Sequence, residues 1–190
     1  MGWIRTIPWS EAEGLLKEAY DWQAASLGEP SEYTMLGSLY PELVYERLRL
    51  YKTVEGCPSG LSPIERQVAN LVTSVMNCTP HCSSGSTLKV QALGVAPELV
   101  DAINADPRTA RSGDPRLDAI IAYAVKLTLD AGGTTEEDIE ALRAHGLSDL
   151  DILDLNNRVA YFCYTNRVAN GLGLKTIMHT VREATLALPR

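Results

Sequence analysis

Apolar residues recur at helical spacing along almost the whole chain. The stretch LSPIERQVANLVTSVMN, for example, places Val68, Leu71, Val72 and Val75 on one face, after a serine cap at Ser62 and a proline at the first helical position. Comparable signals predict further helices over residues 10–28, 41–54, 97–104, 114–131, 135–145, 149–172 and 175–186. No stretch alternates apolar and polar residues as a strand would. The pattern therefore predicts an all-α fold.

Glycine and proline gather only between the predicted helices, in EGCPSG, ADPRTARSGDP and DAGGT. The first helix is expected to begin with Ser10 as its cap and Glu13 three residues later, and to end at Gly28. A length of 190 residues is enough for one well-buried core. We therefore expect a single domain over residues 1–190, with an N-terminal helical section over about 1–55 and a core bundle over about 56–190.

Composition and charge narrow the classes of function. Apolar residues make up 45% and charged residues 22% of the chain, as in ordinary globular proteins. The net charge of −7 argues against binding to nucleic acid or to an anionic membrane, since both partners attract basic surfaces. No apolar run approaches the roughly 20 residues of a membrane span, and the N-terminus MGWIRTIPWSEAEG has no secretory apolar segment. We expect a cytoplasmic protein whose four cysteines are free thiols.

The segment NCTPHCSSGS carries the candidate chemistry. Thr79 and Pro80 predict a helix start with the threonine hydroxyl as its cap, so His81 and Cys82 would lie in the first turn. The unpaired N–H groups of that turn favour a thiolate, and we expect them to lower the pKa of Cys82. Cys78 would lie just before the cap, at a break between two helices.

Simpler interpretations stay open for the cysteines. Cysteine is among the most buried residue types, so Cys82 could be a packing residue at a helix start. Cys57 in the loop EGCPSG and Cys163 in the apolar run VAYFCYTN are expected to be loop and core residues. A zinc site is not expected, because no second cluster supplies the remaining ligands. We therefore expect neither a metal nor a cofactor.

Two motifs surround the helix that precedes these cysteines. The stretch GLSPIERQVANLVTSVMNCTPHCSSGSTLK partly matches a family pattern that reads L-S-P-x-E-R-E, an apolar-rich run, and then N-x-C-x-x-C-x-x-x-H. Together with WIRTIPWSEAEGLLKEAYD and LSDLDILDLNNRVAYFCYTNRVANGLGL, it resembles the AhpD-like, peroxidase-related branch of the carboxymuconolactone decarboxylase superfamily over nearly the whole chain. The resemblance implies an AhpD-like helical bundle that assembles as a homo-oligomer. Asn166 and Arg167 match the family's T-N-R and are expected to support the bundle or a subunit contact.

The resemblance is poorest at the positions that carry the family's chemistry. In its alkylhydroperoxidases a glutamate, two cysteines and a histidine form a proton relay, and the second cysteine attacks the peroxide. Cys82 matches this second cysteine, whereas the other three positions hold Gln67, Thr79 and Ser86. The departures remove a carboxylate base, a resolving thiol and a group that titrates near neutrality. Cys78 lies one residue too early to replace the missing cysteine.

Three functions remain open, and the sequence leaves undecided whether the chain is an enzyme. The first is an enzyme with an altered, non-peroxidase site that acts on a small organic molecule in a helix-lined pocket around Cys82. The second is a thiol-dependent alkylhydroperoxidase in which Cys82 attacks and Cys78, Cys163 or an external thiol resolves. The third is a non-catalytic oligomeric scaffold or binding protein. The candidate site residues are Cys82, Gln67, Thr79, Ser86, His81 and Cys78.

Overall fold

The computed structural model describes residues 2–180 and contains only helices, turns and loops in that range. Its α-helices are α1 (Gly14–Leu27), α2 (Glu32–Leu36), α3 (Pro41–Glu55), α4 (Pro63–Met76), α5 (Pro80–Ala92), α6 (Pro97–Ala105), α7 (Pro115–Leu129), α8 (Glu136–Ala144) and α9 (Asp149–Gly171). Two short 3₁₀ helices, η1 (Trp9–Glu11) and η2 (Ala131–Gly133), accompany them. The predicted all-α fold is confirmed.

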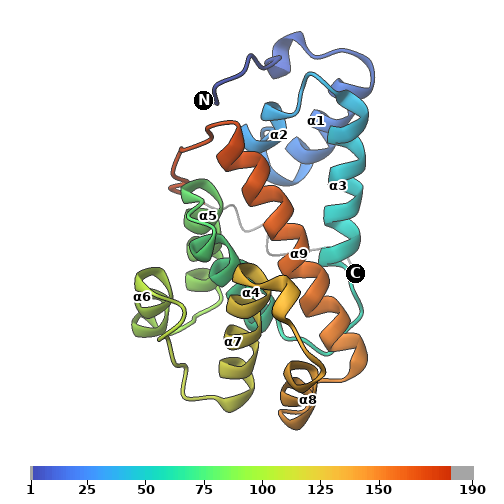
Figure 1. Cartoon of the computed structure of the whole chain (residues 1–190). Helices are drawn as coiled ribbons and strands as arrows, with labels where there is room; N and C mark the ends of the chain where they lie inside the picture. Colours follow the sequence, from blue (N-terminus) through green and yellow to red (C-terminus); the bar gives the residue numbers. More distant parts are fainter. Residues whose placement is uncertain (1, 181–190) are drawn as a thin grey trace.

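Helix α4 lies at the centre of the bundle. It packs against α5, α7 and α9, and the long α9 also contacts α3, which in turn packs on α1 (Figure 1). Val68, Leu71 and Val72 of α4 are completely buried. Since neighbours cover α4 on several sides, its polar side chains are also held in the interior, next to the start of α5. No helix in the described part of the chain is long and apolar enough to cross a bilayer.

The first residues of α4 and α1 show where local sequence signals predict a helix start correctly and where they do not. Ser62 and Glu65 form the expected capping box at the start of α4. By contrast, the predicted cap of the first helix is wrong: Ser10 lies in η1, and Glu13 precedes α1 without a side-chain cap. Gly14, with φ of 53°, turns the backbone into the left-handed region and separates the two helices. Further differences from prediction concern the five-residue α2, which was not foreseen, and the C-terminal segment.

The segment after α9 folds back instead of starting a new helix. Gly173 is left-handed and Leu174 N–H bonds the Ala169 carbonyl, a C-terminal cap that turns the chain away from the helix axis. Residues 175–180, called the tail below, are not helical and pack on α5. The helix predicted over 175–186 is therefore wrong in its first part, and residues 181–186 lie outside the described range.

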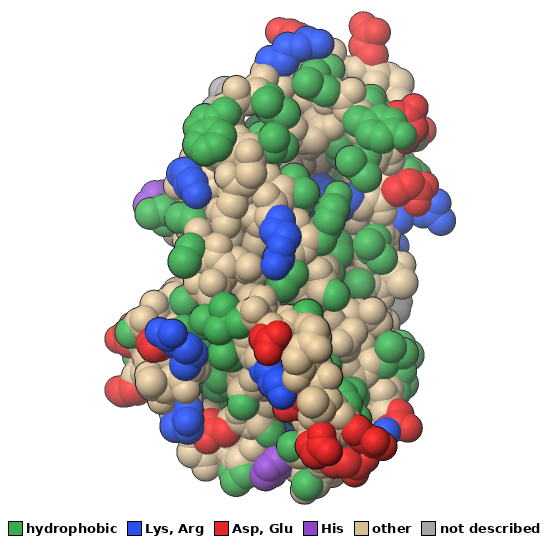
Figure 2. All heavy atoms as spheres, in the orientation of Figure 1, with side chains coloured by type: hydrophobic (Ala, Val, Ile, Leu, Met, Phe, Trp, Pro, Cys, Tyr) green, Lys and Arg blue, Asp and Glu red, His purple; other side chains and the backbone are tan. Residues whose placement is uncertain are grey.

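Acidic and hydrophobic side chains are distributed unevenly over one face of the molecule. Figure 2 shows acidic side chains gathered over the end of the molecule where α8 lies, and hydrophobic side chains scattered over the half that holds α1, α2 and α3. The acidic residues in the first turn of α8 are Glu136, Glu137 and Asp138. Acidic groups at a helix N-terminus are favoured by the helix dipole, so this end has an ordinary structural explanation.

Candidate functional site around Cys82

The break between α4 and α5 is a helix cap built around Cys78. Cys78 has a left-handed φ of 51°, its N–H bonds the Val75 carbonyl at 2.9 Å, and the Thr79 N–H bonds the Ser74 carbonyl at 3.0 Å. This pattern of bonds closes the C-terminus of α4. The Cys78 side chain is exposed and is a free thiol, as are the other three cysteines.

Thr79 precedes α5 but does not cap it through its hydroxyl, so that part of the prediction is wrong. The hydroxyl donates to the Asn77 carbonyl at 3.3 Å and accepts from Asn170 Nδ2 at 2.9 Å. Thr79 is 1% exposed. Because α9 supplies the competing partner, Thr79 fastens the start of α5 to α9 rather than to its own first turn.

Cys82 lies in the first turn of α5 and is partly buried. Burial raises the pKa of its thiol to about 11, although a hydrogen bond from the Asn166 side chain and the charge of Lys89 act in the opposite direction. The expectation of a lowered pKa is therefore wrong. The rise in pKa caused by desolvation of the sulfur outweighs the lowering expected from the helix N-terminus. The sequence pattern indicates the helix start, but it does not indicate how deeply the thiol is buried.

Asn166 connects Cys82 to the polar side chains of α4. It is fully buried on α9, accepts from Asn77 Nδ2 at 3.2 Å and donates to Ser74 Oγ at 3.5 Å. We expected Asn166 to support the bundle, but its contact with the sulfur also makes it part of the site. The available signal was an asparagine in an apolar helix, where a buried amide needs partners.

Neither Gln67 nor Ser86 is among the groups that act on the Cys82 thiol. Gln67 accepts from Asn70 Nδ2 at 3.2 Å, and it stands seven residues before Ser74, roughly 10 Å along the helix. Ser86 is buried one turn after Cys82 on α5. Asn70 is 1% exposed, and its Oδ1 has no hydrogen-bond partner in the described range. An unsatisfied acceptor at such a depth marks a place for a hydroxyl or N–H donor.

Tyr33 of α2 is close enough to Cys82 to be influenced by it electrostatically. Burial raises the pKa of the Tyr33 hydroxyl, the Arg47 guanidinium opposes this rise, and the nearby Cys82 adds to it. The Arg47 guanidinium lies 4.9 Å from the centre of the Tyr33 ring. Burial also raises the pKa of Tyr161 to about 12, against a hydrogen bond from Arg47. The groups that act on the Cys82 thiol are thus the Asn166 amide and the charge of Lys89, with no carboxylate among them, and the Tyr33 hydroxyl is close enough to be affected by Cys82.

The His81 side chain leads away from these groups toward α2 and the tail. It is 6% exposed, and its Nδ1 lies 3.0 Å from Thr176 Oγ1. The Thr176 hydroxyl in turn donates to the Glu32 carboxylate. Burial lowers the pKa of His81, partly offset by the Glu32 charge and by a hydrogen bond to the backbone of Thr176. Glu32 and Thr176 were not candidate residues, since neither belongs to a motif around the cysteines.

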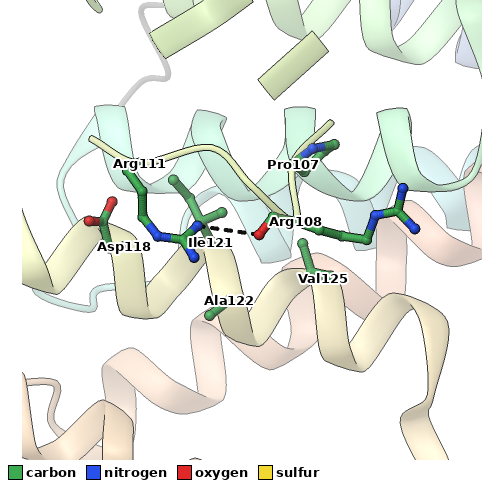
Figure 3. Close-up of a pocket in the computed structure, with 7 residues that line it drawn as sticks. All are labelled: Pro107, Arg108, Arg111, Asp118, Ile121, Ala122 and Val125. Carbon is green, nitrogen blue, oxygen red and sulfur yellow. Dashed lines mark hydrogen bonds between the residues drawn. The ribbon is translucent and has the colours of Figure 1, made fainter. Parts of the chain in front are cut away.

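Cys82 lines neither of two hollows in the surface of residues 2–180. A groove of about 810 Å³ lies between α3 and α9, with Cys57, Tyr161 and Tyr164 among its lining residues. A smaller hollow of about 300 Å³ lies between the α6–α7 loop and α7 (Figure 3); it is lined by Pro107, Arg108, Arg111, Asp118, Ile121, Ala122 and Val125. Tyr161 belongs both to the groove and to the groups around Tyr33. Within residues 2–180, no three His, Cys, Asp or Glu side chains converge as metal ligands would.

No protein-family model and no curated protein sequence matches the chain. Solved structures do. A peroxidase-related protein with an alkylhydroperoxidase AhpD core from Ralstonia eutropha JMP134 matches with a TM-score of 0.81 and 21% identity, over 98% of this chain and 96% of that one. A peroxidase-related protein from Silicibacter sp. TM1040 matches with a TM-score of 0.74 and 27% identity, over 85% of each chain.

A third match is a cysteine-to-alanine variant of the debrominase Bmp8 in complex with 2,3,4-tribromopyrrole. It has a TM-score of 0.72 and 15% identity, over 88% of this chain and 87% of that one. At this identity the match concerns the fold, which hosts more than one activity. The chain therefore has the AhpD-like fold, which it shares with these peroxidase-related proteins.

Proposed function

We propose that the chain is an AhpD-like enzyme that acts on a small organic molecule at Cys82 by chemistry other than peroxide reduction. The observation that carries this proposal is the environment of the sulfur: a partly buried thiol that accepts from the Asn166 amide, with the Tyr33 hydroxyl close enough to be affected by it. Such groups orient a polar or aromatic molecule by hydrogen bonding and ring contact. The unpartnered Asn70 Oδ1 offers a further acceptor in the same interior.

The protonation of Cys82 argues against ordinary peroxidase turnover. A thiol with a pKa of about 11 is ionised on the order of once in ten thousand molecules at pH 7, and the thiolate is the form that attacks peroxides. Gln67 and Ser86 stand where the family's relay has groups that titrate, and neither can take a proton at neutral pH. Cys78 belongs to an exposed helix cap rather than to the partly buried turn that holds Cys82.

The substrate class we propose is a small aromatic or halogenated ring. The debrominase neighbour supports this choice, since its cysteine-to-alanine variant holds 2,3,4-tribromopyrrole on the same fold. Tyr33 and Tyr161 provide aromatic side chains on this chain, Tyr33 close enough to Cys82 to be affected by it. A flat, weakly polar ring suits such surroundings better than a charged metabolite does.

The test compares two reactions in the wild-type protein and Cys82→Ser. Binding of 2,3,4-tribromopyrrole is measured by calorimetry, and consumption of cumene hydroperoxide is measured with dithiothreitol as reductant. We expect the ring to bind wild type with a measurable affinity that changes in Cys82→Ser, and peroxide consumption to be equal in both. Peroxide consumption that depends on Cys82 would instead support the thiol peroxidase, in which the exposed Cys78 or an external thiol resolves. Neither activity in either protein would support the non-catalytic scaffold.

We further propose that the protein self-associates, as the family resemblance implies. Large apolar side chains are exposed on the outer faces of α3 and α9, with Leu43 48%, Leu50 51%, Leu153 54% and Tyr164 41% exposed. The groove between these helices continues the same surface. Exposed apolar side chains on two helices that pack together, Leu50 and Tyr164 among them in the groove, support a contact with a second copy of the chain.

A further inference from the structure

Arg47 of α3 and Lys89 of α5 are charged side chains that are partly buried without a carboxylate partner. Neither forms an ion pair with an Asp or Glu of residues 2–180, whereas every other Lys or Arg of that range that is at least partly buried does so. A charge that is partly removed from water is stabilised by an opposite charge. Both positions therefore suit a negatively charged partner from outside the described chain. The paired residues are Arg66, Arg116, Lys126 and Arg158.

Neutral groups hold the Arg47 guanidinium in place. Its Nη2 donates to Thr34 Oγ1 at 2.6 Å, its central carbon lies 4.9 Å from the centre of the Tyr33 ring, and it hydrogen-bonds the Tyr161 side chain. Burial raises the pKa of both tyrosine hydroxyls, so each stays neutral at pH 7 and can donate a hydrogen bond. A guanidinium carries several N–H donors in one plane, and it can still receive an anion when its other partners are neutral.

Lys89 is the cation that acts on the Cys82 thiol. It stands seven residues after Cys82, so both side chains lie on the same face of α5. Its Nζ donates to the Tyr51 hydroxyl at 3.3 Å. Burial lowers the pKa of Lys89, but Tyr51 and the charge of Glu55 outweigh burial, so the pKa is raised overall and the ammonium stays charged. Glu55 is bound to Arg158 at 2.7 Å, so it is already paired.

One row of aromatic side chains connects the two cations. Tyr51 stands four residues after Arg47, on the same face of α3. The Tyr51 and Tyr161 rings lie 5.6 Å apart, and Tyr161 hydrogen-bonds Arg47. Contacts therefore run without a break from Lys89 through Tyr51 and Tyr161 to Arg47, and on to the ring of Tyr33. Tyr161 also lines the groove of about 810 Å³ between α3 and α9, so the row borders an open volume.

We propose that Arg47 and Lys89 form an anion-binding subsite near Cys82, in which the ring substrate is held as its anion. The inference rests on the proposed function at Cys82 and specifies its substrate: a flat ring with an acidic N–H or O–H, as arises when halogens withdraw electrons from the ring. Such a ring is weakly polar until it loses this proton to water. Its negative charge is then spread over the ring, which suits a guanidinium, an ammonium and neutral phenols that donate hydrogen bonds.

Two rings of nearly the same shape test the subsite in the wild-type protein. Equilibrium dialysis at pH 8 measures binding of 2,4,6-tribromophenol, which is largely ionised at this pH, and of its O-methyl ether, 2,4,6-tribromoanisole, which cannot ionise. We expect the phenol to bind about tenfold more tightly or better. Equal affinities, or no binding of either ring, would overturn the anion subsite. Equal affinities would leave the proposed ring class intact, because the comparison of wild type with Cys82→Ser tests that class separately.

Substitutions test the two cations individually. We expect Arg47→Gln and Lys89→Gln each to lose most of the preference for the phenol, and Arg47→Lys to keep a larger part of it because the charge remains. Affinity for the ether should stay unchanged in all three, which shows that the site is still folded. Arg49→Gln is the matched control, since it removes an exposed positive charge from the same helix. A preference that survives both Arg47→Gln and Lys89→Gln, or that falls equally in Arg49→Gln, would overturn the assignment.

Discussion

Cys78 has a left-handed backbone conformation, which is unfavourable for residues that carry a Cβ atom. Its φ of 51° serves the cap of α4, a position where glycine is the usual residue. We expect Cys78→Gly to raise the free energy of unfolding by about 1 kcal/mol, because the left-handed conformation costs glycine little. Urea unfolding followed by circular dichroism measures this change. Cys57→Gly is the control, since Cys57 has no positive φ and glycine should only add freedom to the unfolded chain. Equal effects of the two substitutions would contradict the strain at Cys78.

At Cys82 the opposing effects of burial and hydrogen bonding can be separated by substitution. The Asn166 amide lowers a thiol pKa that burial has raised to about 11. Asn166→Leu keeps most of the volume and removes the donor, so we expect the pKa to rise further and alkylation at pH 9 to slow several-fold. The measurement is the pH dependence of iodoacetamide alkylation, with exposed Asn157→Leu as control. Faster alkylation in Asn166→Leu than in the control would show that Asn166 does not favour the thiolate.

The start of α9 depends on one carboxylate with two backbone partners. Asp151 accepts from the Ser148 N–H at 2.9 Å and from the Gly60 N–H at 2.5 Å. Burial raises the pKa of Asp151, but these bonds and the charge of Arg116 outweigh it, so the pKa is lowered overall. Because the folded-state pKa lies below the unfolded value of about 4, its stabilisation is present above that pH. The stabilisation is then lost as pH falls through the folded-state pKa.

We therefore expect Asp151→Asn to lower the free energy of unfolding by about 1–3 kcal/mol at pH 7, and by much less at pH 2.5. Urea unfolding at the two pH values provides the measurement. Asp149→Asn is the matched control on the same turn, since its side chain is 81% exposed. A loss of the same size at both pH values would mean that the charge of Asp151 does not contribute.

At the scale of elements, the sequence predicted the helices whose signals are local. Ser62 and Glu65 lie three residues apart, so the pattern contains both partners of the cap. The predicted start of the first helix at Ser10 is wrong because the backbone at Gly14 has a positive φ and breaks the helix there. A glycine within a helical pattern does not by itself predict such a break. The tail was misread as a helix because Met178 and its neighbours are held by contacts with α5, which no local pattern records.

The candidate site was predicted in part for the same reason. The position of Cys82 in the first turn of α5 followed from Thr79 and Pro80. Its high pKa and its contact with Asn166 depend on α9, which lies far away in sequence. Long-range partners therefore decide the chemistry of the site, whereas local signals decide only where the cysteine sits.

The whole molecule is tied together by a buried ionic cluster at the end of α3. Arg158 of α9 is completely buried, bonds Glu55 at 2.7 Å and lies 3.3 Å from Asp154. We expect Arg158→Leu to lower the free energy of unfolding by about 3–5 kcal/mol, because the buried Glu55 loses its ion-pair partner and Asp154 keeps only Arg66. Thermal and urea unfolding measure the loss. Arg49→Leu removes an exposed ion pair with Glu46 and should cost less than about 1 kcal/mol. Similar losses in both variants would contradict a special role for the cluster.

The exposed apolar side chains on the outer faces of α3 and α9 allow a test of self-association. Leu50 is 51% exposed beside the groove between these helices, where a second copy would cover it. We expect the wild-type protein to elute as a multiple of its monomer mass in light-scattering chromatography, and Leu50→Glu to shift it toward the monomer. A buried, unpaired charge at the contact is costly, whereas the same charge on a free surface is not. Leu129→Glu on α7 is the control, since Leu129 is 56% exposed away from this groove. A monomeric wild type, or an equal shift in both variants, would rule out this face as the contact.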